Sequence, residues 1–154
     1  GTNVAPSATA TSSGGGSTTY GPTQMNNGTL QSSCAFCWIS AGSTPGTAWV
    51  QYVWSSPQEL FGMWIDTQPA MSSVCSSSGR SLDGGTVQYW DGSVWVDVEV
   101  FSDMADDWYP SSVPIEFIPP ITTTQLRIYG VHADTIGSQK SNPMIFEWEV
   151  YECG

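Results

Sequence analysis

Positively charged residues are scarce in this sequence. Lys and Arg together number three among 154 residues, whereas Asp and Glu number fourteen, and the formal net charge at pH 7 is −11. Because nucleic-acid binding depends on clustered Lys and Arg, nucleic acid is excluded as a partner. The same charge repels anionic membrane surfaces, and no apolar run approaches the roughly 18 residues of a membrane span, so a membrane partner is disfavoured as well.

Cysteine and histidine are also few. The four cysteines are Cys34, Cys37, Cys75 and Cys153, and the single histidine is His132. A zinc site at Cys34 and Cys37 would need a second close pair of ligands, which is missing. We therefore expect two structural disulfides in an oxidising compartment. Three connectivities are possible, and we favour one in which Cys75 and Cys153 each join one of the other two.

Motifs for catalysis are missing. No Gly-x-Ser-x-Gly elbow occurs, and the loop acids Asp103, Asp106 and Asp107 suit solvation or metal binding better than a glycosidase pair. We expect a protein that is not an enzyme. With eight Trp, few charged residues and many Ser, Thr and Gly, the composition is typical of a secreted or cell-surface β domain.

Helical periodicity is absent, whereas alternation of apolar and polar residues is frequent. The clearest example is a predicted hairpin over 85–100, in which Asp91-Gly92 predicts a two-residue type I′ turn. Its Val residues and Tyr89 share one parity and are expected to face a core. Further strands are predicted at 3–12, 49–54, 61–66, 115–118, 125–129 and 146–151. Short strands at this spacing predict one all-β domain over 1–154, an antiparallel β-sandwich or jelly roll.

Strand patterns also assign the tryptophans. We expect five of them in the core, and at most one of Trp90 and Trp95 beside them. The five are Trp38, Trp49, Trp54, Trp64 and Trp148.

The strand directions divide the turns between two ends of the sandwich. The turns at 55–60, 91–92 and 119–120 are short and fall on one end. The long loops 40–47, 68–84, 102–113 and 131–145 fall on the other, and loop 13–22 joins them. Binding residues commonly lie on loops grouped on a rigid scaffold, so the long-loop end is the candidate site.

Several stretches together resemble discoidin (coagulation-factor C-type) domains, in order and spacing, over nearly the whole chain. They are Trp49-Val50-Gln51-Tyr52-Val53, the hairpin segment 89–95, Leu126-Arg127-Ile128-Tyr129 and the segment 146–151. The resemblance implies a galactose-binding-like jelly roll, shared with family 32 carbohydrate-binding modules. Such domains bind sugars, phospholipid headgroups or proteins through loops at one end, without catalysis.

The resemblance also implies a structural calcium site. The matching positions are the segment 25–28 and Glu147, with Asn27 in place of an acidic ligand. Calcium takes oxygen ligands, which carbonyls, Asn27, Ser32 and Glu147 can supply. The inserted segment 32–37 departs from the family pattern, and a disulfide there is the alternative to the ion.

Sugar binding requires aromatic rings for C–H faces and polar groups for hydroxyls. The residues of this kind at the long-loop end are Tyr20, Arg80, Asp83, Trp108, Tyr109, His132 and Asn142. We therefore predict an extracellular carbohydrate-binding module. The alternative is an adhesion or protein-interaction domain of a secreted or cell-surface assembly.

Overall fold

The computed structural model describes residues 1–14, 20–29, 37–40, 47–67, 80–101, 112–133 and 143–154. Their elements are the strands β1 (Thr2–Asn3), β2 (Thr9–Ser12), β3 (Trp38–Ile39), β4 (Ala48–Asp66), β5 (Arg80–Trp90), β6 (Trp95–Phe101), β7 (Ser112–Ala133), β8 (Pro143–Ile145) and β9 (Glu147–Glu152), with the 3₁₀ turns η1 (Ala5–Ser7) and η2 (Pro22–Gln24). No helix within these residues is long and apolar enough to cross a membrane.

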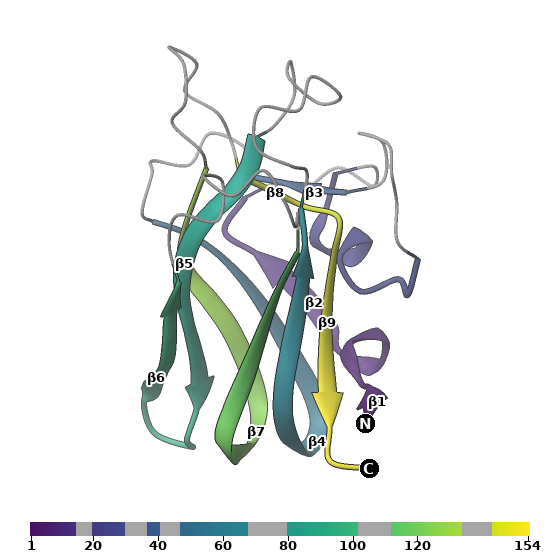
Figure 1. The fold of residues 1–154 in the computed structure, drawn as a ribbon, viewed down its shortest axis with the longest axis vertical. Coiled ribbons are helices and arrows are strands. Elements are labelled where there is room, and N and C mark those ends of the chain that lie inside the picture. The colour runs from purple at the N-terminus through teal and green to yellow at the C-terminus, as the bar shows by residue number, and fades with distance from the viewer. Residues whose placement is uncertain (15–19, 30–36, 41–46, 68–79, 102–111, 134–142) are drawn as a thin grey trace.

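The long strands β4 and β7 form the frame of the fold. They pair antiparallel from Ala48 with Val131 to Asp66 with Ser112, and the register shifts where residues 54–57 of β4 and 117–120 of β7 have no paired partner in this ladder. Such bulges bend a strand pair, and the prolines at 57, 119 and 120 cannot donate to a ladder. Both strands accordingly fold over at one end of the molecule (Figure 1). The arms match the predicted strands, whereas the predicted stop at Pro119-Pro120 is a bend within one continuous strand.

The bent strands contribute to both layers of a sandwich. The arms 60–66 of β4 and 112–121 of β7 lie with β9 and β1, and the arms 48–53 and 125–133 lie with β2, β5 and β6. The strands pair antiparallel, except that β5 and β8 pair parallel. The short strand β3 pairs with β8. The predicted antiparallel jelly-roll sandwich is confirmed. At the N-terminus, η1 interrupts the single strand predicted over 3–12.

The core is aromatic at its centre. Tyr52 of β4 stacks on Trp148 of β9, with ring centroids 4.1 Å apart, and its hydroxyl donates to the Trp148 carbonyl at 2.8 Å. The prediction of core tryptophans is confirmed for Trp38, Trp54 and Trp148. It is wrong for Trp64, which is 39% exposed, and for Trp49, which is half-buried, because both lie on outward-facing positions of β4.

The predicted hairpin is β5 and β6, and its turn is longer than expected. Trp90 pairs with Trp95, so residues 91–94 form the turn, and the Asp91 carboxylate accepts from the backbone N–H groups of Ser93 and Val94. A bulge opposite Val87 changes the parity of β6. Val98 packs on the core as predicted, whereas Val94 and Val100 are exposed. Trp90 and Trp95 are both half-buried, outside the core.

The two described cysteines lie at opposite ends of the sandwich. Cys37 precedes β3, which pairs with β8, whereas the N–H of Cys153 donates to Glu59 beside the bend of β4 (Figure 1). A disulfide between Cys37 and Cys153, one of the pairings left open, is therefore wrong. Cys34 and Cys75 lie outside the described residues, so the other pairings stay predictions.

Candidate functional site

The strand ends opposite the bends of β4 and β7 meet at one end of the sandwich. Ser40 donates its N–H to Pro143, and the Thr67 hydroxyl donates to Met144 while it accepts from the N–H of Leu82. These bonds join the ends of β3, β4, β5 and β8 into one platform, at the end of the sandwich opposite the bends (Figure 1). The predicted division places the bends and the β5–β6 turn at the other end, and the structure confirms it.

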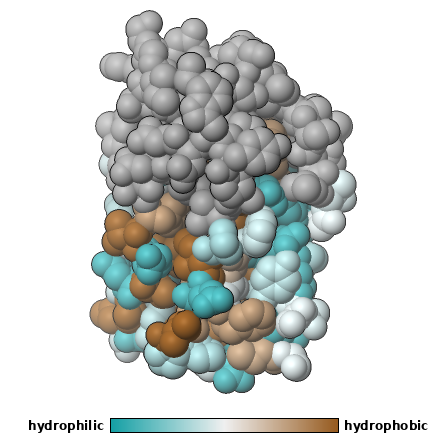
Figure 2. All heavy atoms as spheres, in the orientation of Figure 1, coloured by the Kyte–Doolittle hydropathy of each residue, from teal (hydrophilic) through white to brown (hydrophobic). Residues whose placement is uncertain are grey.

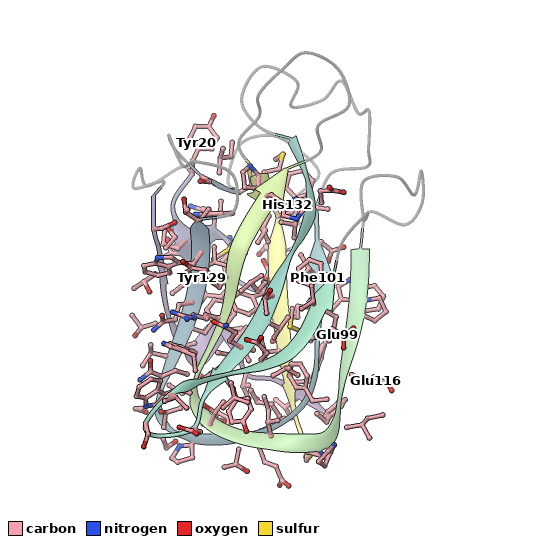
Figure 3. All side chains as sticks on the ribbon, turned by 90° about the vertical axis from the view of Figure 1, so that its left-hand side faces the viewer. Tyr20, Glu99, Phe101, Glu116, Tyr129 and His132 are labelled. Atoms are coloured by element: carbon pink, nitrogen blue, oxygen red, sulfur yellow. The ribbon has the colours of Figure 1, made fainter. Side chains whose placement is uncertain are left out.

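A carboxylate and an imidazole meet on this platform. In β5, Leu82 pairs with Ala133 and Gly84 pairs with His132, so Asp83 is the extra residue of a β-bulge. Bulges redirect side chains, and Asp83 Oδ2 lies 3.5 Å from His132 Nδ1. The Asp83 side chain is 20% exposed and the His132 side chain is 36% exposed, so both reach solvent. Figure 3 shows His132 at the loop end of β7. The structure thus brings together two of the predicted site residues.

Gly84 lets the imidazole lie against the strand backbone. A Cβ at this position would lie 2.7 Å from His132 Nε2 and 2.5 Å from the Phe101 carbonyl oxygen. Gly84 and Phe101 were not among the site residues predicted from the sequence. The signal was present in Gly84-Gly85, because glycine inside a strand pattern marks a bulge or a close backbone approach.

We therefore expect Gly84→Ala to disturb both the fold and the Asp83–His132 pair. Overpacking against backbone costs about 1–3 kcal/mol, and the ring must move away from its place. Urea unfolding measures the first effect, and the NMR signals of the imidazole measure the second. Gly92→Ala is the matched control for added volume, because nothing lies within 4 Å of its Cβ position, although its φ of +106° adds strain of its own. Unchanged imidazole signals in Gly84→Ala would contradict this account.

Tyr20 lies away from this pair. It packs against a small apolar cluster of Cys37, Ile39, Met144 and Phe146, and its carbonyl accepts from the N–H of Ile39. Burial raises the pKa of the Cys37 thiol to about 11. Figure 3 shows Tyr20 and His132 on separate parts of the loop end. Tyr20 therefore supports the platform rather than sharing the Asp83–His132 position.

The remaining predicted sugar contacts are not placed. The backbone of Arg80 pairs with Pro143 at the start of β5, and its side chain lies outside the described part of the chain. Trp108, Tyr109 and Asn142 also lie outside the described residues.

Glu147 is an ionisable residue buried in the interior of the described structure. It is 1% exposed, its Oε1 accepts from the Gly28 N–H at 3.0 Å, and its Oε2 has no hydrogen-bond partner among the described residues. Burial raises the pKa of Glu147 to about 7, and Glu149 and Asp66 add to this effect, although the Gly28 bond opposes it. A buried carboxylate oxygen without a partner suits a cation, because charge in the interior needs compensation.

The segment 25–28 covers Glu147, since the Trp148 N–H donates to the Met25 carbonyl and Gly28 has a φ of +76°. Asn27 is exposed, and its Oδ1 accepts from the Thr29 N–H, so its predicted ligand role gains no support from this geometry. Ser32 lies outside the described residues. Within the described residues no three His, Cys, Asp or Glu side chains gather around a common point. Calcium would fit here only with carbonyl oxygens beside the Glu147 carboxylate.

Comparisons with known proteins identify similar structures but no similar sequence family. No protein-family model matches the chain, and neither does any curated protein. Among solved structures, the family 32 carbohydrate-binding module of Streptococcus pneumoniae EndoD matches with a TM-score of 0.77 and 21% identity, over 99% of this chain and 100% of that one.

Two further modules are similar. Chitosan-binding module 1 of a chitosanase/glucanase from Paenibacillus sp. IK-5 has a TM-score of 0.69 and 20% identity, over 98% and 99% of the two chains. The family 32 module of C. perfringens NanJ, solved in complex with galactose, has a TM-score of 0.70 and 13% identity, over 96% of each chain. The chain therefore has the galactose-binding-like sandwich fold of family 32 carbohydrate-binding modules.

Proposed function

We propose that this domain is a non-catalytic extracellular carbohydrate-binding module that takes a glycan at its loop end. The observation that carries the proposal is the Asp83–His132 pair, held over Gly84 on the platform where the strand ends meet. A carboxylate and an imidazole provide an acceptor and a donor for vicinal sugar hydroxyls. The similar solved structures are binding modules, including one in complex with galactose and one described as chitosan-binding.

The charge of the chain narrows the ligand class. A net charge of −11 disfavours polyanionic glycans, and Asp83 places a carboxylate at the site itself. We therefore expect a neutral or cationic glycan. A glycan array with calcium and with EGTA tests the proposal, and the absence of binding to every glycan would contradict it.

His132→Ala is expected to weaken binding of the best array ligand at least tenfold, which corresponds to about 1.4 kcal/mol. The reason is the loss of one sugar contact and of the group that orients Asp83. Isothermal titration gives the affinity, and Gln58→Ala, near the bend of β4 at the opposite end, is the control. Equal affinities for His132→Ala and Gln58→Ala would place the ligand elsewhere.

An adhesion or protein-interaction role is the second candidate. It is favoured by large apolar side chains exposed on the arms 60–66 of β4 and 112–121 of β7, namely Phe61, Trp64 and Ile118, of which Ile118 is 83% exposed. Binding to no glycan, together with capture of one defined extracellular protein, would support this role.

A structural calcium ion at Glu147 is part of the proposal. The ion would use the Glu147 carboxylate and carbonyl oxygens near the segment 25–28, and it would join that segment to β9. It would have no role in chemistry at the sugar. We also propose that the four cysteines form two disulfides, Cys34–Cys153 and Cys37–Cys75 or else Cys34–Cys37 and Cys75–Cys153, which suits a secreted domain.

A further inference from the structure

One sheet of the sandwich is formed by β2, β5, β6 and the arms 48–53 of β4 and 125–133 of β7. Its outer face carries an ordered set of aromatic, amide and guanidinium groups. We call the following set the Arg127 face: Trp49 and Gln51 of β4, Arg127 and Tyr129 of β7, Gln88 and Trp90 of β5, and Trp95 and Asp97 of β6. The core-facing residues of the same strands, such as Val50, Ile128 and Val87, are buried, so the alternation of the strands points this set outward.

The strand register arranges these residues in rows across the sheet. Gln51 pairs with Arg127, which pairs with Gln88, which pairs with Asp97. Beside this polar row, Trp49 pairs with Tyr129 on one side, and Trp90 pairs with Trp95 on the other. Neighbouring strands lie about 4.8 Å apart, so a row over the four strands β4, β7, β5 and β6 extends roughly 14 Å. This length suits a chain of several sugar rings better than one ring.

Arg127 is fixed at the centre of the face. Its guanidinium carbon lies 4.0 Å from the Trp95 ring centroid and 4.9 Å from that of Tyr129. Its Nε donates to Gln88 Oε1 at 2.7 Å, and Gln88 Nε2 donates to Asp97 Oδ1 at 2.7 Å. No described residue accepts a hydrogen bond from its Nη atoms. The arrangement is therefore preorganised and still has donors to offer, as a binding surface requires.

The face is open to solvent within the described residues. Tyr129 is 39% exposed, and Trp49, Arg127 and Trp95 are half-buried. Figure 3 shows Tyr129 and Glu116 on opposite sides of the sandwich, with His132 above Tyr129 at the loop end. Figure 2 looks onto the opposite sheet, with β9 and the 112–121 arm of β7, where hydrophobic and hydrophilic residues are mixed.

The charges on the Arg127 face favour a neutral ligand. Arg127 and Asp97, joined through Gln88, leave the rows close to neutral, while the whole chain carries −11. A polyanion would be repelled by the chain, and a polycation would meet Arg127 at the centre of the face. Aromatic rings stack on the C–H faces of sugars, and amide and guanidinium groups bond their hydroxyls. We propose that the Arg127 face is a second glycan-binding surface, which takes a neutral polysaccharide chain across the strands, independently of the loop end. This inference shares only the class of ligand with the proposed function.

Affinity electrophoresis tests the inference. The full chain and its variants are run through gels that contain hydroxyethyl cellulose, mixed-linkage β-glucan or neutral galactan. We expect at least one polymer to retard the wild type, and we expect Tyr129→Ala and Arg127→Ala to weaken that affinity at least tenfold. Trp64→Ala is the matched control, because Trp64 has the same 39% exposure on the other sheet and should remain within twofold of the wild type. Arg127→Lys keeps the charge and loses the planar stacking, and it should fall between wild type and Arg127→Ala.

This experiment distinguishes the loop-end site from the Arg127 face. His132→Ala should bind the polymer within twofold of the wild type even if it loses the best array ligand. Loss in His132→Ala with retention in Tyr129→Ala would overturn the second surface and leave the loop end intact. Retardation by none of the polymers would overturn it as well. A dimer in sedimentation that dissociates in Tyr129→Ala would show that a second copy covers the face, and would also overturn it. Circular dichroism of each variant confirms that the sandwich is folded.

Discussion

Replacement of Glu147 by glutamine is expected to remove both a pH dependence of stability and a response to calcium. The pKa of Glu147 is raised to about 7 from an ordinary value of 4.5, first by burial and then by Glu149 and Asp66. Between these values the unfolded chain has lost the proton that the folded chain still holds. The free energy of unfolding therefore falls as pH rises from about 4.5 through 7, by an amount on the order of 3 kcal/mol without calcium.

Calcium is expected to reverse this loss above pH 7, because it compensates the charge on the Glu147 carboxylate. At one hundred times its dissociation constant, a ligand of the folded state adds about 2.7 kcal/mol. Urea unfolding from pH 4.5 to 8, in EGTA and in calcium, measures both effects. Glu147→Gln should flatten the dependence on pH in EGTA and show no gain in calcium. Glu116→Gln, an exposed carboxylate on the same sheet, is the control and should follow the wild type. Parallel curves for wild type and Glu147→Gln would contradict this assignment.

Trp148→Ala is expected to destabilise the domain by about 3–5 kcal/mol, the range for removal of a large aromatic from a core. Trp148 is fully buried, and its ring centroid lies 4.1 Å from that of Tyr52 in a stacked pair. The Tyr52 ring also forms a T-shaped pair with Trp54, with the centroids 6.0 Å apart. Within the part of the chain that the structure describes, the indole N–H of Trp148 has no hydrogen-bond partner, so the loss is one of packing. For a domain of this size, it corresponds to a fall in Tm of about 10 °C.

Trp64→Ala is the control for this change, because it removes the same side chain from an exposed position on β4. We expect it to cost less than about 1 kcal/mol, as is usual for surface substitutions. Differential scanning calorimetry compares the two. Equal falls in Tm would contradict the assignment of the Tyr52–Trp148 stack as the centre of the core.

Local patterns in the sequence predict the strands because apolar alternation is a local property. They predict the β5–β6 hairpin, the arms of β4 and β7, and the burial of Trp148. They do not separate Trp64 from Trp148, since a strand pattern does not say which of its two faces meets the core. The burial of Glu147 is also invisible locally, because it depends on the segment 25–28, far away in the sequence, which packs over β9.

Local patterns in the sequence also do not predict the contacts within the candidate site. Asp83 and His132 were predicted as members of one loop end, but their contact depends on a bulge in β5 that no local pattern locates. Tyr20 was predicted for the same end and instead packs on the cluster beside β8, because its carbonyl accepts from the N–H of Ile39 in β3, which pairs with β8. Direction along the strands predicts which end a residue occupies, whereas register decides which residues touch.

An NMR titration with the best ligand from the glycan array tests the central claim most directly. Binding at the loop end predicts that the backbone amides of Asp83, Gly84 and His132 shift during the titration, while those of Gln58 and Gly92 at the opposite end stay in place. The absence of binding, or shifts confined to Gln58, Gly92 and their neighbours, would contradict it.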